Sequence, residues 1–164
     1  QASEDTPDGT ERHRSSPSIW TSIPSTHDLG GSLFSTACPA PLGYDLRPYI
    51  SPFAPALAAA DLAVARSGGS VFELAAHGLP AILIPYPHAA ADHQTGNARW
   101  MKDGGAAVVV TDGDLDASRL RSEVDALLSD QSRLAQMAAA AEALARPNAA
   151  ADIAAEVVKA AEGR

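Results

Sequence analysis

The sequence is poor in cysteine, lysine and aromatic residues. Among its 164 residues there is one cysteine and there are two lysines, and aromatic side chains make up 5%. The single cysteine, Cys38, excludes an internal disulfide and a cysteine-rich zinc site, and this usage is typical of a reducing compartment.

Long apolar runs and an excess of basic charge are also lacking. No stretch reaches the roughly 20 apolar residues of a membrane span, and no apolar segment near the start indicates a secretory signal peptide. The net charge is −8, which disfavours nucleic acid and anionic lipid surfaces because their phosphates repel an acidic chain. We therefore expect a cytoplasmic protein without a nucleic-acid partner.

Composition divides the chain near residue 55. Residues 1–55 hold eight of the twelve prolines, and Pro, Ser, Thr and Gly together account for 26 of these 55 positions. Such a segment has too few apolar side chains to offset the entropy lost on ordering. We predict that residues 1–41 are irregular or disordered and that residues 44–164 form one domain.

From residue 44 onward, short apolar runs alternate with stretches of helical character. Short, uniformly apolar strands are typical of a parallel sheet that helices cover on both faces. The predicted strands are 44–50, 62–66, 81–85 and 106–110, and the predicted helices are 51–61, 70–77, 92–102, 116–128, 131–144 and 148–161.

The predicted fold class is α/β, with a partial doubly wound, Rossmann-like parallel sheet. A complete doubly wound domain usually has about five to seven strands, whereas this sequence supplies three clear strands and a weaker one at 44–50. In open parallel sheets, ligands bind outside the carboxyl ends of the strands. The loops that follow the strands are therefore where we expect functional residues.

The loop after strand 62–66 reads Arg66-Ser67-Gly68-Gly69-Ser70-Val71-Phe72-Glu73. Glycines let a ligand approach the backbone, and a following helix start offers unpaired N–H groups, which suits a diphosphate. The spacing matches neither a Walker loop nor G-x-G-x-x-G. On spacing alone, a phosphate site and an ordinary turn both remain possible.

Glu73 has two interpretations. Ser70-x-x-Glu73 is the pattern of a capping box, in which the glutamate accepts a hydrogen bond from the N-cap N–H. Alternatively, the carboxylate accepts hydrogen bonds from vicinal sugar hydroxyls. The local pattern by itself favours the cap.

Two further loops carry polar groups. His88, Asp92 and His93 do not have the spacing or the additional ligands of a metal site, so we expect no metal. Gln94 and Asn97 share a helix face, where their amides either bind sugar hydroxyls or face solvent. The backbone of Ile50, at the end of the predicted strand 44–50, has an N–H and a C=O that could pair with a planar base.

A resemblance to a known family rests on three segments: ADLAVARSGGSVFELAAHGLPAILIPYPH (60–88), DHQTGNA (92–98) and GGAA (104–107). With their surroundings, residues 44–164, they resemble the C-terminal donor-binding part of the MurG family, the bacterial UDP-N-acetylglucosamine transferases of peptidoglycan synthesis. The resemblance implies one lobe of a two-lobed GT-B glycosyltransferase that needs no metal or other cofactor. It also implies a peripheral location on the cytoplasmic face of the plasma membrane.

The family's donor is UDP-N-acetylglucosamine, and its acceptor is undecaprenyl-pyrophosphoryl-N-acetylmuramoyl-pentapeptide. By motif, the resemblance assigns the ribose hydroxyls to Glu73 and the uracil to the backbone of Ile50. It assigns the GlcNAc hydroxyls to Gln94 and His93. It assigns the binding of the phosphates and the sugar to Arg66, Ser67, Gly68, Gly69, Ser70 and Val71. It assigns no catalytic residue to this part of the family.

The sequence also departs from the family. Residues 1–41 show no resemblance, the acceptor-binding lobe is missing, and only Gly30-Gly31-Ser32-Leu33 stands where a glycine-rich phosphate loop is expected. We therefore expect a donor-binding fragment that is inactive alone. The alternatives are a stand-alone subunit that pairs with a separate membrane-bound acceptor-lobe protein, and a non-catalytic nucleotide-sugar binder.

Overall fold

A computed structural model describes residues 19–21 and 47–163, with side chains from residue 47 onward. Four parallel strands form one sheet in the order β1-β2-β3-β4. Helices connect β2, β3 and β4, as in other sheets whose parallel strands are joined by crossovers. The strands are β1 (Ile19–Thr21), β2 (Leu62–Ala65), β3 (Ala81–Leu83) and β4 (Ala107–Val109).

Six α-helices and two short 3-10 turns complete the described chain. The helices agree with the predicted segments to within two residues at each end, because most of them are alanine-rich and alanine has the highest helix propensity. They are α1 (Phe53–Ala59), α2 (Val71–Ala76), α3 (His93–Asp103), α4 (Ala117–Ser129), α5 (Gln131–Leu144) and α6 (Ala149–Glu162), and the turns are η1 (Ala90–Asp92) and η2 (Asp112–Asp114).

The strand predicted at 44–50 is wrong over its described residues. Residues 47–50 are not part of the sheet, and Pro48 lacks the N–H that a ladder position requires. The strand next to β2 is instead β1, in register with Ile19 opposite Leu62. It lies within the segment predicted to be irregular, whose other residues up to position 41 lie outside the described part of the chain.

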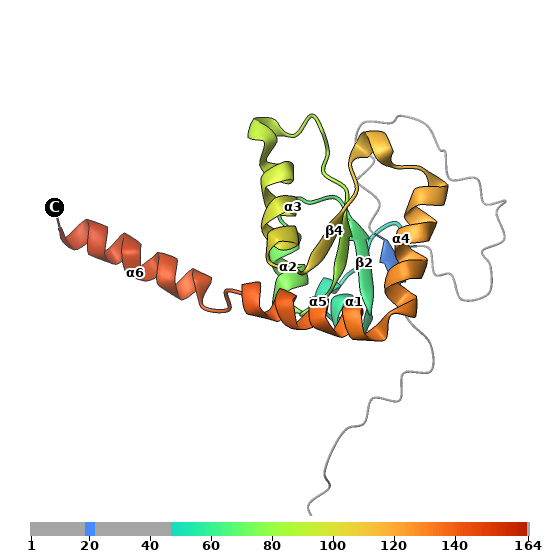
Figure 1. The fold of residues 1–164 in the computed structure, drawn as a ribbon. Coiled ribbons are helices and arrows are strands. Elements are labelled where there is room, and N and C mark those ends of the chain that lie inside the picture. Colours follow the sequence, from blue (N-terminus) through green and yellow to red (C-terminus); the bar gives the residue numbers. More distant parts are fainter. Residues whose placement is uncertain (1–18, 22–46, 164) are drawn as a thin grey trace, which may run out of the picture.

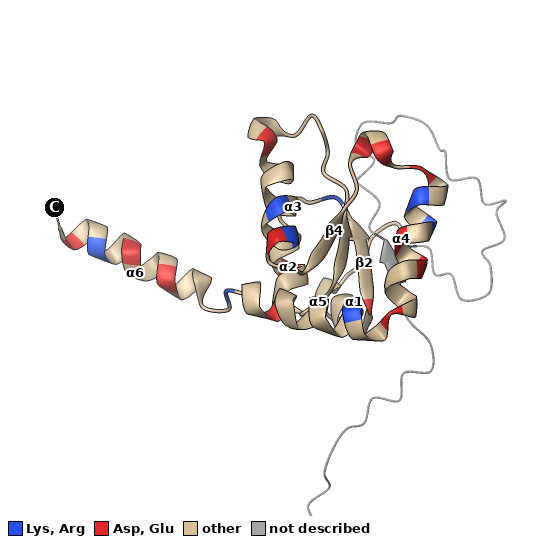
Figure 2. Cartoon of the chain, viewed as in Figure 1, with Lys and Arg blue, Asp and Glu red and all other residues tan. Residues whose placement is uncertain are grey.

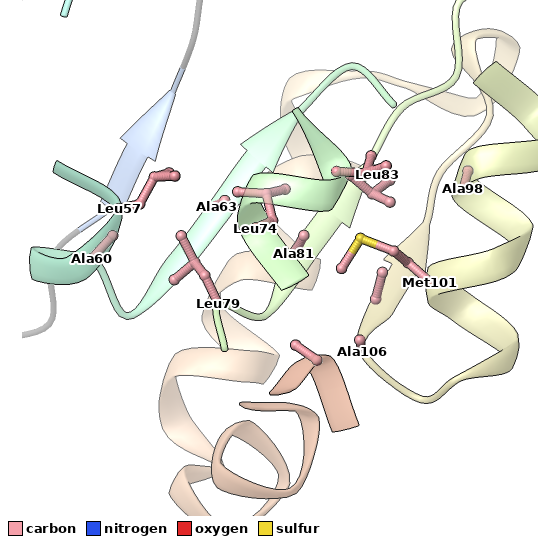
Figure 3. Close-up of a cluster of buried hydrophobic side chains, with 13 residues drawn as sticks. Leu57, Ala60, Ala63, Leu74, Leu79, Ala81, Leu83, Ala98, Met101 and Ala106 are labelled. Atoms are coloured by element: carbon pink, nitrogen blue, oxygen red, sulfur yellow. The ribbon is translucent and has the colours of Figure 1, made fainter. Parts of the chain in front are cut away.

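The sheet has a different apolar layer on each face, because successive side chains of a strand point in opposite directions. Figure 1 shows α2 and α3 on one side of the sheet and α4 on the other. On the first side, Ala63, Ala81 and Leu83 pack against helical residues such as Leu74 and Met101 (Figure 3). On the second side, the buried residues are Leu62, Val64, Ile82, Ile84, Val110, Leu127, Leu134 and Met137.

Helix α5 lies near the turns that lead into β3 and β4. A Cβ atom on Gly78 would lie 2.6 Å from Glu142 Cγ, and one on Gly104 would lie 2.5 Å from Leu144 Cδ1. These turns precede the strands, so α5 closes the sheet at the amino-terminal ends of β3 and β4 (Figure 1). The carboxyl-terminal ends lie at the opposite edge.

Helix α6 projects away from the rest of the molecule (Figure 1). None of its residues is buried, and Ile153, Val157 and Val158 are all more than half exposed. Within the described part of the chain, no helix combines the length and the apolar character needed to cross a membrane.

Candidate functional site

The loops at the carboxyl ends of β2, β3 and β4 gather at one edge of the sheet. They comprise residues 66–70, called the glycine loop below, residues 84–92 with the turn η1, and residues 110–114 with the turn η2. Hydrogen bonds connect these three loops to one another and to α3, as described below. The topology therefore brings together most of the residues that the sequence singled out.

Backbone is openly accessible in the glycine loop. A Cβ atom on Gly68 or Gly69 would have no neighbour within 4 Å, and neither residue has a positive φ. The fold itself does not require glycine at either position. The backbone N–H groups of Gly68, Gly69 and Ser70 donate no hydrogen bond to any described residue, so they are available to an anion.

Helix α3 holds the glycine loop from one side. Ser67 is fully buried, and its hydroxyl donates to the carbonyl of Gln94 at 2.8 Å. The Asn97 amide donates to the carbonyls of Ser67 and Gly68, at 2.9 and 3.4 Å. The side-chain NH₂ group of Asn97 is therefore used to hold the glycine loop. It is not available to a ligand, and it is not simply exposed to solvent.

Val71 is the first residue of α2, and its side chain belongs to the hydrophobic core. It is fully buried, and its N–H donates to the Gly68 carbonyl at 3.3 Å. The side chains of Val71 and Ser67 thus face inward. Any contribution of these two residues to a ligand site comes from the backbone around them.

Glu73 does not form the capping box that its spacing suggested. Ser70 has αR backbone angles, with φ −60° and ψ −15°, and its side chain makes no capping hydrogen bond. Glu73 is exposed, and its carboxylate makes no hydrogen bond or ion pair with a described residue. The capping interpretation is wrong, and the carboxylate remains free to accept hydrogen bonds from another molecule.

Arg66 connects the ends of three strands. Its Nη1 group donates to the carbonyls of Ile84 and Pro85, at 3.4 and 3.3 Å, and forms an ion pair with the Asp112 carboxylate. Its guanidinium carbon lies 5.7 Å from the centre of the Tyr86 ring. Nη2 and Nε make no hydrogen bond to a described residue, so two nitrogen atoms of the cation remain available.

Gln94 and His93 lie at the start of α3. The Gln94 Oε1 atom accepts a hydrogen bond from the Tyr86 N–H at 3.0 Å, whereas its Nε2 donors have no partner in the described chain. His93 is exposed, and its Nδ1 lies 2.6 Å from the Ala90 carbonyl oxygen. Since a carbonyl only accepts, Nδ1 carries the proton and Nε2 stays free.

Ile50 lies outside the sheet, in the chain that leads to α1, and is partly buried. Its backbone groups are therefore not occupied by a strand ladder. Within residues 47–163, no three His, Cys, Asp or Glu side chains are grouped so that they could hold a metal ion. His88 instead packs edge-on against Tyr86, with ring centroids 5.6 Å apart.

Sequence reasoning missed two residues of this network. It gave Asp112 and Tyr86 no role, although Asp112 follows β4 by three residues and Tyr86 follows β3 by three. The rule that ligands bind at the carboxyl ends of parallel strands already pointed to the loop that holds Tyr86, and applied to the strand 106–110 it would also have pointed to Asp112. Their partners, however, become evident only in the folded chain.

Comparison with known protein families gives a match over most of the chain. The family model of the glycosyltransferase family 28 C-terminal domain matches residues 30–157. The chain belongs to this family. Because the match begins at residue 30, the expectation that residues 1–41 show no resemblance is wrong for positions 30–41.

Curated relatives carry the name UDP-N-acetylglucosamine--N-acetylmuramyl-(pentapeptide) pyrophosphoryl-undecaprenol N-acetylglucosamine transferase. The protein from Moorella thermoacetica is 50% identical over 105 residues, which cover 63% of this chain and 28% of the relative. The protein from Azoarcus sp. is 46% identical over 121 residues, or 73% of this chain and 33% of the relative. The chain thus spans about a third of the length of these relatives.

A solved structure supports the same assignment. The crystal structure of MurG from Acinetobacter baumannii matches with a TM-score of 0.65 and 33% identity, over 70% of this chain and 35% of that one. The predicted resemblance to the C-terminal part of MurG and the predicted Rossmann-like GT-B lobe are both confirmed.

Proposed function

We propose that this chain binds UDP-N-acetylglucosamine as the donor half of an N-acetylglucosaminyltransferase. The observation that carries this proposal is that two kinds of group without a hydrogen-bond partner among the described residues follow one another in the chain. They are the backbone N–H groups of the glycine loop and, one turn further along, the carboxylate of Glu73. The glycine loop thus offers hydrogen-bond donors and the start of α2 offers an acceptor, and a nucleoside diphosphate sugar needs both.

The glycine loop receives the diphosphate in this proposal. Backbone N–H groups in a loop that precedes a helix form a concave site for anions. Gly68, Gly69 and Ser70 supply three such donors, and the absence of side chains at the first two lets phosphate oxygens reach them. The free nitrogen atoms of Arg66 add a charged donor beside the loop.

The other predicted site residues bind the two ends of the donor. Glu73 accepts hydrogen bonds from both ribose hydroxyls, a role for which an ionised carboxylate has enough lone pairs. The Nε2 atoms of Gln94 and His93 contact GlcNAc hydroxyls, and the backbone of Ile50 pairs with the edge of uracil. These contacts fix the sugar next to the phosphates.

Neutral donors and Arg66 stabilise the leaving UDP in this proposal, so that the reaction needs no metal or other cofactor. As the bond from the sugar to the phosphate breaks, negative charge grows on the phosphate oxygens. Preorganised N–H groups aimed at such a developing charge lower the barrier. The glycine loop supplies these N–H groups.

The acceptor comes from elsewhere. Glycosyl transfer requires donor and acceptor to be enclosed together with water excluded, and the described residues form a single lobe. We propose that a second lobe, in the same polypeptide or in a separate membrane-bound partner, supplies undecaprenyl-pyrophosphoryl-N-acetylmuramoyl-pentapeptide and the general base. The reaction would then take place at the cytoplasmic face of the membrane.

Isothermal titration calorimetry of the chain with UDP-GlcNAc tests the donor site. We expect Glu73→Ala to raise Kd at least about tenfold, because hydrogen bonds to a charged group are worth about 1.5–3 kcal/mol. The melting temperature should stay within about 1 °C, since Glu73 contacts no described residue through a polar bond. Glu156→Ala, the same change on the exposed helix α6, serves as control and should leave Kd unchanged.

Absence of UDP-GlcNAc binding by the unmodified chain would overturn the proposal. A large loss of stability in Glu73→Ala with unchanged affinity would restore a structural role for this residue. Transfer of GlcNAc to the lipid acceptor by this chain without an acceptor lobe would contradict the two-lobe part of the proposal alone.

A further inference from the structure

We infer that Asp112 is a positioning residue of the donor site and acts through Arg66. The inference rests on the proposed function, because it concerns the same site. Asp112 begins the turn η2 beyond β4, whereas Arg66 begins the glycine loop beyond β2, 46 positions earlier. The ion pair between them connects the turn η2 to the glycine loop.

Arg66 has three acceptors of unequal strength. The carbonyls of Ile84 and Pro85 lie at 3.4 and 3.3 Å, near the outer limit for a hydrogen bond, and both are neutral. The carboxylate of Asp112 is charged and lies closer. Charge-assisted bonds are about twice as strong as neutral ones, so Asp112 determines where the guanidinium sits.

The glycine loop is thereby held from both sides. Asn97 and Ser67 attach it to α3, and Arg66 attaches its first residue to the loops after β3 and β4. Figure 2 shows acidic residues of the η2 region beyond the end of β4, at the same edge of the sheet. A loop that is ordered before the ligand arrives loses less entropy on binding, and its affinity is correspondingly higher.

Positioning and plain electrostatics predict opposite signs for the removal of this carboxylate. Asp112 is a negative charge near a proposed diphosphate site, so its loss should by itself tighten the binding of an anion. If Asp112 instead orders Arg66 and the glycine loop, its loss should weaken binding. The direction of the change in Kd therefore separates the two roles.

Calorimetry of the full chain with UDP-GlcNAc provides the test. We expect Asp112→Asn to raise Kd about fivefold, in keeping with a half-exposed ion pair that also orders a loop. Asp114→Asn is a matched control: it removes the same charge from the same turn, but among the described residues the Asp114 carboxylate accepts a hydrogen bond only from the Thr111 hydroxyl, at 2.6 Å. Binding that is unchanged or tighter in Asp112→Asn, or weakened equally in both variants, would overturn the inference.

The same substitution in a variant that lacks Arg66 shows whether Asp112 acts through Arg66. In Arg66→Met, which lacks the cation, Asp112→Asn should change Kd by less than about twofold, since interacting residues are not additive. A full fivefold effect in that background would contradict the inference. The melting temperatures of all variants confirm that each one folds.

A ligand-free measurement separates this inference from the proposed function. The ¹⁵N order parameters of the Gly68 and Gly69 amides should fall in Asp112→Asn and stay at the level of a rigid backbone, about 0.85, in Asp114→Asn. Equal order parameters in both variants would count against positioning even if the chain binds UDP-GlcNAc. Failure of the unmodified chain to bind UDP-GlcNAc would count against the proposed function and leave this measurement to decide the role of Asp112.

Discussion

Glycines in this chain serve two different purposes, and the residue scale separates them. Gly78 lies two residues beyond the end of α2 and has φ +59°, a left-handed conformation that favours glycine. Gly68 and Gly69 have no positive φ and no close neighbours, so the fold does not demand them. At these two positions the proposed function supplies the reason for glycine, because a phosphate group would approach the backbone there.

Substitution in the glycine loop should therefore affect binding and spare the fold. We expect Gly69→Ala to raise the Kd for UDP-GlcNAc at least about tenfold, because a methyl group would occupy the space of a phosphate oxygen. The free energy of unfolding should change by less than about 0.5 kcal/mol. Gly163→Ala, at the exposed end of α6, is the control that should leave both quantities unchanged, because its Cβ atom would make only an ordinary contact with the Lys159 carbonyl at 3.5 Å. Calorimetry and urea denaturation measure the two quantities.

Gly78→Ala should do the opposite. An alanine there combines a left-handed backbone with a Cβ atom 2.6 Å from Glu142 Cγ, and each effect costs about 1–3 kcal/mol. Urea denaturation should show a loss of about 2 kcal/mol or more. In the double variant with Glu142→Ala part of the loss should return, because only the strained φ remains; a neutral Gly78→Ala would show that neither effect operates.

At the scale of elements, the sequence predicts best those helices and strands whose formation depends on their own residues and not on a distant partner. Helix α5 was predicted with its observed ends, Gln131 and Leu144, because the helix propensity of its many alanines is a local property of the sequence. Strand β1 was not predicted, since three residues form a strand only by pairing with β2. The strand predicted before α1 failed over residues 47–50, because its alternating pattern has no partner there.

Helices α5 and α6 should differ sharply in their contribution to stability. Ending the chain after Arg146 removes α6, none of whose residues is buried, and should shift the melting temperature by less than about 2 °C. Ending it after Ser129 also removes α5, with the buried residues Leu134, Met137 and Ala141. That chain should not fold cooperatively, because core truncations cost about 2–5 kcal/mol each, as circular dichroism during heating would show.

A large drop in melting temperature on removing α6 alone would show that this helix packs on the lobe after all. An unchanged transition without α5 would be equally unexpected, since α5 contributes to both hydrophobic layers.

At the scale of the whole molecule, charge sets how the donor is attracted. The chain carries a net charge of −8, and Arg66, the cation at the start of the glycine loop, is already paired with Asp112. Long-range attraction of a diphosphate is therefore weak, and binding must depend on short-range contacts with backbone N–H groups. Such contacts respond little to screening by salt.

We therefore expect the Kd for UDP-GlcNAc to change less than about threefold between about 0.05 M and about 0.5 M sodium chloride. A site built from several unpaired cations would lose affinity much more steeply. Calorimetry over this range measures the slope, and a loss of more than about tenfold would indicate that unpaired positive charge dominates the site.

The sequence by itself determined the alternation of strands and helices, the position of the glycine loop and the family, because each of these resides in a contiguous stretch of chain. Only the tertiary structure decided what individual side chains do. It buried Ser67 and Val71, showed that Ser70 and Glu73 form no cap, directed the Asn97 amide to the glycine loop and paired Arg66 with Asp112. These outcomes depend on contacts between segments that are distant in the chain, and on competition between acceptors at one donor, which local patterns do not encode.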